Sequence, residues 1–492
     1  MKIKIKQHIA TPSPASVDKL ENLIILLPTK LPDHGWATLP YGKILKARVE
    51  HRRLDKLDEP LSTELPNVLG TRVGLTCIGE NISSFDLLER ARKLAAPILT
   101  GNPGAVSIWC AHLDPELQAW VVDAFISALL AGDYQLPAYK SDAGPARRLG
   151  IIDLYGVEKK VNLDRTVAQA QANNLVRRLT ALPPNYLTPS HYCQEAAQLA
   201  GTHGWKTHFY DIRQLTRLKA GAFLAVARGS PRRDAGILHL HYTPSRAAKA
   251  KRPLALVGKG ICFDTGGTNL KPARSMHGMH EDMAGSAVAL GTLQALSELG
   301  ADFPIDCWLA LAENHIGPEA YRQNEVVTAS NGTTIEVIHT DAEGRMVLAD
   351  TLALASKAKP GLILDFATLT GSCVQALSSR YAGAFTNRDE YIPRIIAAGK
   401  ASGERVWPFP LDADFDQELK SAIADIKQCT LENEADHILA SRFLSRFVGD
   451  IPWIHIDLAS SSHKGGLAHI PTDTTGFGIR FSLELLLSGD LP

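Results

Sequence analysis

Two short segments of this chain concentrate side chains that can bind metal ions. The first, at residues 258–271, reads GKGICFDTGGTNLK, and the second, at residues 339–345, reads HTDAEGR. With one aspartate between them, they supply four carboxylates and two lysines: Asp264, Asp282, Asp341, Glu343, Lys259 and Lys271. Carboxylate oxygens are hard ligands that suit Mg, Mn or Zn. The segments therefore predict a site for divalent cations.

The glycines of the first segment also raise the question of a phosphate-binding loop. A Walker loop needs Ser or Thr directly after its Gly-Lys pair, but Gly260 follows Lys259. A dinucleotide-binding fingerprint would need glycine at the position of Phe263. We therefore do not expect phosphate binding in this segment.

Each carboxylate also has a purely structural interpretation. Asp282 can interact with the dipole of a following helix, and Asp341 and Glu343 can lie in a solvated turn. Four carboxylates gathered at the strand ends of one sheet, however, would repel one another unless cations lie between them. Two cations about 3.5 to 4 Å apart can share bridging carboxylates, activate a water and polarise a carbonyl, which is typical of hydrolysis.

Strand and helix patterns alternate through the second half of the chain. The expected strands are residues 254–257, 305–312, 333–338, 362–367 and 453–458. The expected helices are residues 284–299, 346–357 and 435–447. This alternation requires crossover connections and gives a largely parallel sheet. Ligands bind beyond the carboxyl ends of the strands in such sheets, which is where we expect both segments to lie.

The first part of the chain predicts a separate, smaller domain. It mixes short apolar runs and turn-rich stretches with a helical pattern at residues 115–130, and it contains no cluster of ligands or nucleophiles. A further helical pattern, at residues 164–182, ends at a Pro-Pro pair that cannot continue a helix. We expect an α/β protein with three parts: a small N-terminal α/β domain at 1–160, a linker helix at 161–182, and a larger C-terminal catalytic domain at 183–492 whose mixed, largely parallel sheet is flanked by helices.

Charge and cysteine content bear on partners and location. Lys plus Arg and Asp plus Glu both number 52, so no net field attracts the whole chain to nucleic acid or to an anionic membrane. The seven cysteines are scattered and never form a CxxC pair, which argues against a disulfide framework or a thiolate zinc site and for a reducing compartment. No apolar run reaches membrane-spanning length. We expect a cytoplasmic protein with neither membrane nor nucleic-acid partners.

The run HTDAEGRMVLAD at residues 339–350 resembles the signature of the leucyl (cytosol) aminopeptidase family of two-metal aminopeptidases, whose usual form begins NTDAEGR. The similarity covers the whole second half in the same order, at residues 183–189, 257–260, 263–267, 270–272, 282–283, 367–371 and 475–478. The first domain resembles the family only weakly. The resemblance implies a hydrolase that releases N-terminal amino acids from peptides by attack of a metal-activated water.

The resemblance also implies a ligand set for two metal ions. Asp264 and Glu343 would bridge both ions, Lys259 and Asp282 would complete one site, and Asp341 would complete the other. Zn or Mn are the expected ions, with Mg or Co as alternatives. A lysine binds metal only as the neutral amine, so the adjacent cation must lower its pKa.

Two further cationic residues match the family's active site, and both are implied to be catalytic. Lys271 would stabilise negative charge on the tetrahedral intermediate, and Arg345 would anchor a bicarbonate that acts as general base. The pocket for the first side chain of the substrate would be formed by Met279, Thr368, Leu369 and Gly371.

The implied partners are peptides with a free N-terminus and five further copies of the chain in a homohexamer. The sequence departs from the family where His339 replaces the usual Asn, for which we expect a local hydrogen-bonding role rather than metal ligation. It departs again at residues 460–462, three serines that follow an expected strand. A non-enzymatic DNA-binding accessory protein on the same fold is the alternative interpretation.

Overall fold

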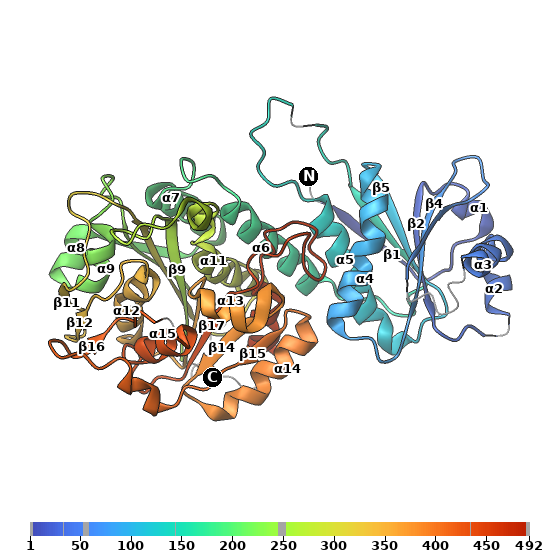
Figure 1. Cartoon of the computed structure of the whole chain (residues 1–492). Coiled ribbons are helices and arrows are strands. Elements are labelled where there is room, and N and C mark those ends of the chain that lie inside the picture. Colours follow the sequence, from blue (N-terminus) through green and yellow to red (C-terminus); the bar gives the residue numbers. More distant parts are fainter. Residues whose placement is uncertain are drawn as a thin grey trace. The chain divides into compact units, whose positions relative to one another are not determined.

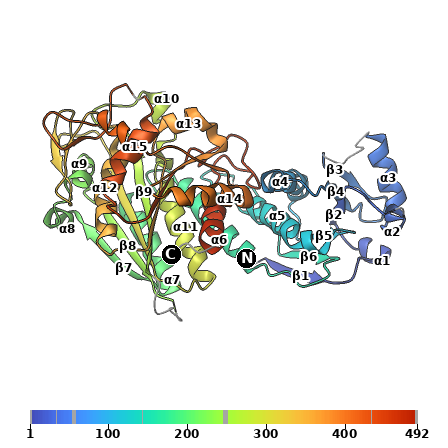
Figure 2. The same ribbon diagram turned by 90° about the horizontal axis from the view of Figure 1, so that it is seen from below.

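The computed structural model describes residues 3–32, 34–52, 59–142, 144–244, 252–432 and 434–488. The chain divides into two compact units (Figures 1 and 2). One comprises Met1–Ala170 with Lys464–Asp473, and the other comprises Gln171–His463 with Thr474–Pro492. The division falls inside helix α6 (Asp164–Thr180), the helix expected at residues 164–182. The domain boundaries drawn from the sequence stay a prediction.

The first unit contains a six-stranded sheet in the order β1-β6-β5-β2-β4-β3. Its strands are β1 (Lys4–His8), β2 (Asn22–Pro28), β3 (Leu61–Glu64), β4 (Arg72–Ile78), β5 (Ala105–Cys110) and β6 (Ile151–Tyr155). Strand β3 pairs antiparallel with β4, and the other neighbours are parallel. The helices are α1 (Pro14–Val17), α2 (Gly35–Thr38), α3 (Gly42–His51), α4 (Ser84–Thr100) and α5 (Pro115–Asp133).

The second unit is built on an eight-stranded sheet in the order β15-β14-β17-β13-β9-β10-β8-β7. These strands are β7 (Lys206–Asp211), β8 (Gly236–Tyr242), β9 (Leu254–Asp264), β10 (Ile305–Asn314), β13 (Leu362–Ala367), β14 (Ala382–Thr386), β15 (Val406–Pro408) and β17 (Trp453–Asp457). The central strands β17, β13, β9 and β10 are parallel, whereas β8 and β7 continue the sheet antiparallel. The expected mixed, largely parallel sheet is therefore confirmed.

Helices cover both faces of this sheet. They are α7 (Pro189–His203), α8 (Ile212–Arg217), α9 (Gly221–Ala227), α10 (Ala273–Met276), α11 (Ala284–Glu298), α12 (Glu343–Ser356), α13 (Gly371–Leu377), α14 (Ile392–Ser402), α15 (Asp436–Ser445) and α16 (Ile479–Leu487). In Figure 2, α9 and α12 lie on one side of β8 and β9, and α11 lies on the other. Among the described residues, the structure contains no helix with the length and apolar content needed to cross a membrane.

Short elements connect these layers. A second sheet consists of β11 (Val326–Thr328), β12 (Thr334–Glu336) and β16 (Ile426–Lys427). Single 3₁₀ turns are η1 (Met279–Glu281), η2 (Ser378–Arg380), η3 (Asp389–Tyr391) and η4 (Ala413–Gln417). One of them, η1, packs against β9 and leads into α11.

Two expected elements differ from those observed at the places where chemistry was anticipated. The strand expected at residues 254–257 continues as β9 to Asp264, so Lys259 lies within a strand rather than in a loop. The apolar pattern ends earlier than the strand because Gly258 and Gly260 carry no side chain to mark it. Helix α12 begins at Glu343, three residues before the expected start, because its first turn carries the polar residues of the motif.

Helix α11 approaches the sheet so closely that only glycine fits at two contact points. A Cβ added at Gly285 would lie 2.2 Å from the carbonyl oxygen of Phe366, and one added at Gly258 would lie 2.4 Å from Cα of Ser286. In both cases the obstructing atom belongs to the backbone, which cannot rotate away. This close packing fixes α11, and the segment that leads into it, against β9 and β13.

We predict that Gly285→Ala destabilises the second unit by about 1 to 3 kcal/mol, the usual cost of overpacking a filled core. Gly201 in α7 is the matched control, because a Cβ there meets no atom within 4 Å. Gly201→Ala should leave stability unchanged or raise it by up to about 1 kcal/mol through helix propensity. Chemical denaturation of both variants measures the difference, and equal midpoints would contradict the close contact.

Candidate metal centre

The residues singled out in the sequence meet at the carboxyl ends of the central strands. Asp264 is the last residue of β9 and Asn314 is the last residue of β10. Glu343 opens α12, and Thr368 directly follows β13. Since these strands are parallel, their carboxyl ends share one edge of the sheet, where α/β proteins bind ligands.

A bulge in β9 contributes to this arrangement. Ile261 pairs with Ala312, but the next pair is Asp264 with Asn314, so β9 has one more residue than β10 between the two pairs. Bulges of this kind bend a strand and redirect its side chains, and they are frequent beside active sites. Here the bulge sets Asp264 directly beside Asn314.

Three of the predicted ligands form a tight cluster. Asp264, Asp341 and Glu343 each offer a carboxylate oxygen, and these oxygens lie within 4.8 Å of one another. Asp264 and Glu343 are buried, whereas Asp341 is partly exposed. Buried acidic groups this close together are unfavourable without positive charge between them.

Two lysines supply positive charge to these carboxylates. The Nζ of Lys259 lies 2.8 Å from Oδ1 of Asp282 and 2.9 Å from Oε1 of Glu343. The Nζ of Lys271 lies 2.9 Å from Oδ2 of Asp264 and 2.6 Å from Oδ1 of Asp341. Each ammonium therefore joins two carboxylates.

Burial dominates the electrostatics of the carboxylates. It raises the pKa of Asp264 well above its ordinary value, and repulsion by Glu343 and Asp282 adds to the rise. Burial likewise raises the pKa of Asp282 to about 6 despite its attraction to Lys259. For Glu343, burial is outweighed by attraction to the lysines, chiefly Lys259, and the pKa is lowered. The centre thus holds at least one firmly ionised carboxylate beside others that resist ionisation.

Attraction to the carboxylates, rather than burial, decides the pKa of the two lysines. Burial favours their neutral amines, but attraction to Asp282 and Glu343 outweighs it, so the pKa of Lys259 is raised. The pKa of Lys271 is raised in the same way, chiefly by Asp264. Both groups are therefore ammonium ions when only protein groups surround them.

This donor set fits divalent cations. Its ligands are oxygens with one nearby amine, and Oδ2 of the buried Asp282 has no hydrogen-bond partner within the protein. A buried carboxylate oxygen without a partner costs free energy unless another group binds it. The four carboxylates are therefore suitable ligands for divalent cations such as Mg, Mn or Zn.

Asn314 is an important residue of this centre that the sequence did not single out as functional. Its Nδ2 donates to Oδ1 of Asp264 at 2.8 Å and to the carbonyl oxygen of Thr340 at 3.0 Å. It also lies 3.5 Å from Oε2 of Glu343. The side chain therefore orients Asp264, one of the predicted ligands. Its position at the end of a strand that was expected from the sequence could have identified it as a candidate.

Arg345 has an anionic partner within the chain. Its buried guanidinium donates from Nη2 to both carboxylate oxygens of Asp436, at 2.7 and 2.8 Å, and from Nη1 to the carbonyl oxygen of Gln428 at 3.0 Å. Asp436 is the first residue of α15. Sequence reasoning missed Asp436 and Gln428, which lie more than eighty residues beyond Arg345 in the chain.

One of the residues predicted to line the substrate pocket, Thr368, borders the carboxylate centre. The Oγ1 of Thr368 donates to Oδ1 of Asp282 at 2.7 Å, and the Thr368 carbonyl accepts from Nζ of Lys259 at 2.9 Å. The backbone N–H of Leu369 donates to Asp457 at 3.1 Å. Gly371 is exposed at the start of α13, and Met279 is half-buried in η1. Their joint role as a pocket stays a prediction.

The two departures from the family motif take local structural roles. His339 accepts at Nδ1 a hydrogen bond of 3.3 Å from the backbone N–H of Asp341, in agreement with the local role expected for it. Ser460 is fully buried, whereas Ser462 is exposed. The carbonyl oxygens of Ser460 and Ser461 both accept from the hydroxyl of Thr475.

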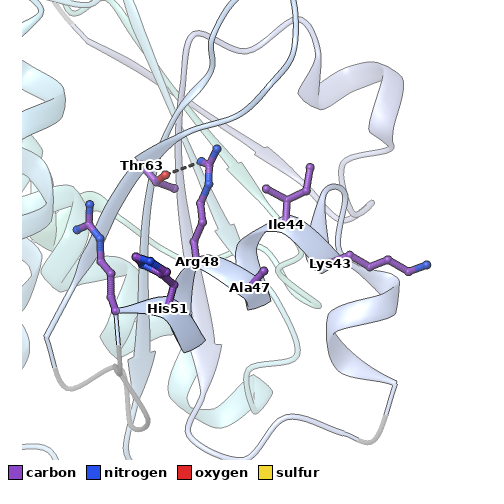
Figure 3. Close-up of a pocket in the computed structure, with 7 residues that line it drawn as sticks. Lys43, Ile44, Ala47, Arg48, His51 and Thr63 are labelled. Atoms are coloured by element: carbon purple, nitrogen blue, oxygen red, sulfur yellow. Dashed lines mark hydrogen bonds between the residues drawn. The ribbon is translucent and has the colours of Figure 1, made fainter.

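The first unit gathers a different kind of residue. Figure 3 shows a pocket lined by Lys43, Ile44, Ala47, Arg48, His51, Arg52 and Thr63. Its Arg48 donates to the hydroxyl of Thr63. The pocket is basic and contains no carboxylate among its lining residues. Among the described residues, two groups of side chains could hold a metal ion, and both lie in the second unit: Asp264 with Asp341 and Glu343, and His239 with His241 and Asp306.

Comparison with known proteins gives consistent matches. Residues 174–483 match the family described as "Cytosol aminopeptidase family, catalytic domain". A "Probable cytosol aminopeptidase" from Polaromonas sp. is 33% identical over 476 residues, covering 96% of this chain and 91% of that protein. One from Syntrophotalea carbinolica is 41% identical over 334 residues, covering 68% and 66%. The solved structure "Bottromycin maturation enzyme BotP in complex with Mn" matches with a TM-score of 0.83 and 29% identity, over 95% of this chain and 99% of that one.

We predict that Asn314→Ala weakens Mn²⁺ binding about 10- to 100-fold, the usual effect of removing a group that orients a metal ligand. Asn331 is the matched control, because it lies exposed in a turn and accepts only from the backbone of Thr333 among the contacts described. Equilibrium dialysis of both variants against Mn²⁺ makes the comparison. Equal affinities would show that Asn314 does not orient the ligands.

Proposed function

The chain belongs to the cytosol aminopeptidase family of metal-dependent exopeptidases, and we propose that it acts with two divalent cations bound at the carboxylate centre. In this proposal it releases single amino acids from the N-termini of peptides by attack of water on the first peptide bond. The observation that carries the proposal is the cluster of three carboxylate oxygens within 4.8 Å at the strand ends.

We assign the cations to the residues implied by the family motif. Asp264 and Glu343 would bridge both ions, Lys259 and Asp282 would complete one site, and Asp341 would complete the other. When bound, such ions polarise the scissile carbonyl and lower the pKa of a water molecule. Zn or Mn are the ions we propose, with Mg or Co as alternatives, and the similar structure of BotP in complex with Mn supports Mn.

Lys259 must change its protonation state for this role. Its Nζ already lies within 3 Å of two assigned ligands, Asp282 and Glu343, so it is near enough to share their cation. Only the neutral amine has a lone pair to offer, and a nearby dication favours that form. Binding of a cation would therefore favour loss of the Lys259 proton.

Lys271 would remain charged and act on the substrate. Its Nζ is held between Asp264 and Asp341 at the border of the cluster, with its side chain partly open to solvent. An ammonium there can donate to the oxygen of the carbonyl under attack as negative charge develops on it. A free amino group at the N-terminus of the substrate would bind one of the cations through its nitrogen lone pair, which would restrict cleavage to the end of a peptide.

We further propose that Asp436 takes the position expected for bicarbonate on Arg345. The two charges are already paired through both carboxylate oxygens at 2.7 and 2.8 Å, and the guanidinium is fully buried. Only Nε of Arg345 has no hydrogen-bond partner within the protein, so an external anion that binds two guanidinium nitrogens would have to compete with this carboxylate or with the Gln428 carbonyl, which is costly. The general base of the reaction would then be part of the chain.

The substrate pocket would accept neutral side chains broadly. Met279 and Leu369 provide flexible and apolar surface, and the thioether of a methionine adapts to several shapes. Such pockets discriminate by only about 1 to 3 kcal/mol per methylene. We therefore expect activity on Leu, Met and Ala, with Leu preferred weakly at most.

A metal-restoration assay tests the proposed function. Chelator-treated protein should recover hydrolysis of Leu, Met and Ala chromogenic amides when Mn²⁺ or Zn²⁺ is returned, and it should not cleave N-acetylated versions. Asp264→Asn and Glu343→Gln should lose activity and bound metal together, because a bridging ligand is missing. Full metal occupancy in both variants would contradict the bridging assignment, and absence of turnover with every metal would overturn the function.

A variant of Lys271 distinguishes metal binding from catalysis. We predict that Lys271→Ala keeps its metal but loses about 10²- to 10³-fold in kcat, as expected for one lost donor to a developing oxyanion. Lys400→Ala is the control, because this exposed lysine lies in α14.

A second prediction concerns the anion on Arg345. Asp436→Ala should lose about 10²-fold in kcat, and added bicarbonate should restore part of the loss because it can then bind the vacated guanidinium. The wild-type enzyme should not respond to bicarbonate. Asp436→Asn keeps the shape of the side chain and therefore controls for loss of activity through unfolding. Asp389→Ala is the control for substitution of an exposed aspartate. A wild-type rate that rises with bicarbonate would contradict the proposal.

We also propose a cytoplasmic homohexamer, as is implied by the family. The seven cysteines are all free, which supports a reducing compartment. Light scattering at micromolar concentration should give about six times the chain mass of 53.3 kDa. A mass near that of one chain would rule the hexamer out.

A further inference from the structure

A second group of metal-binding side chains lies on the antiparallel part of the large sheet. It consists of His239 and His241 on β8 and Asp306 on β10. The two histidines are two residues apart in a strand, so they project from the same face. Asp306 pairs directly with His241 in the register of the two strands, which brings all three side chains together.

The donor atoms of these residues converge on one point. The Nε2 of His239 lies 2.7 Å from Oδ1 of Asp306, and Nδ1 of His241 lies 2.8 Å from the same oxygen. We propose that this group binds a divalent transition-metal ion of the zinc type, in addition to the cations of the catalytic centre. The site requires no residue from outside the second unit.

The spacing needs little change to hold an ion. Zinc bonds of about 2.0 to 2.1 Å in tetrahedral geometry set neighbouring ligand atoms about 3.3 Å apart. The observed separations of 2.7 and 2.8 Å are therefore shorter by about half an ångström, which small side-chain rotations supply. Hydrogen bonds to a shared carboxylate oxygen already hold both imidazoles in the required directions.

The surroundings hold the ligands in place and keep them accessible. The ring of Trp308 stacks on His239 at 3.9 Å between centroids and 9° between planes, which fixes the imidazole. Asp306 is buried, while the side chains of His239 and His241 are 21% and 31% exposed, so an ion can arrive from solvent.

The chemistry of the donors selects the ion. Two imidazole nitrogens and one carboxylate suit Zn²⁺, Ni²⁺ or Cu²⁺, whereas Mg²⁺ and Ca²⁺ require mostly oxygen ligands. Lys206, which pairs with His241 from the neighbouring strand β7, is exposed, so its ammonium can extend into water away from the ion. Three protein ligands leave one position for water in a tetrahedral site.

The site is separate from the catalytic centre. Asp306 is the second residue of β10 and Asn314 is its last, so the two lie at opposite ends of one strand. Eight residues of extended chain span about 26 Å. An ion there joins β8 to β10 and would therefore stabilise the antiparallel side of the sheet rather than take part in peptide hydrolysis.

Equilibrium dialysis against Zn²⁺ with metal analysis tests the proposal. Wild-type enzyme should bind one equivalent more per chain at saturation than His241→Asn or Asp306→Asn, whatever number the catalytic centre takes. His203→Gln is the control, because this partly exposed histidine also lies near a carboxylate, Glu298 at 3.7 Å, but has no second histidine beside it. Its stoichiometry should equal that of the wild type.

Two measurements keep the result unambiguous. His241→Asn should retain aminopeptidase turnover within about twofold, which shows that it is folded. Asp264→Asn, in which the catalytic centre is impaired, should still bind the extra equivalent, and Zn²⁺ should raise its melting temperature. Equal stoichiometry in the wild type and both cluster variants would overturn the proposal without affecting the assignment of the catalytic centre.

Discussion

Repulsion among four carboxylates at one buried edge of a sheet is the constraint on which the site depends. Two unit charges 4 Å apart interact by about 4 kcal/mol at the effective dielectric of a protein site. Lys259 and Lys271 each join two of the carboxyl groups, which still outnumber the ammonium ions by two, and burial raises the pKa of Asp264 and Asp282. This excess of carboxyl groups supports the proposals that the centre binds divalent cations and that Lys259 gives up its proton to bind one of them.

Close packing of the surrounding helix and strands keeps these carboxylates in place despite their repulsion. Gly258 and Gly285 allow α11 to contact the sheet backbone, so the segment carrying Asp282 has little freedom to move away from its neighbours. The amide of Asn314 and the hydroxyl of Thr368 then hold Asp264 and Asp282 in fixed orientations. A preorganised ligand set of this kind binds without the cost of rearranging charged side chains at the moment of binding.

The sequence predicted the site better than the details around it. The four carboxylates and two lysines singled out in the sequence are all present in one centre, since short motifs carry their own spacing and the parallel sheet brings strand ends together. Local pattern could not reveal Asp436, because it meets Arg345 only through the tertiary packing of α15. Nor could it reveal that β9 continues through Lys259, because glycines interrupt the apolar pattern that marks a strand.

The extra residue in β9 has a consequence for how this site tolerates change. Lys259 and Asp264 are separated by five positions, an odd number, so a regular strand would point them to opposite faces. The bulge between Ile261 and Asp264 corrects this parity and lets both reach the same centre. The bulge, and not the alternation of a regular strand, therefore sets the face on which Asp264 lies. A substitution that flattened this bulge without removing a residue would turn Asp264 to the opposite face of the sheet, even though Asp264 itself is unchanged.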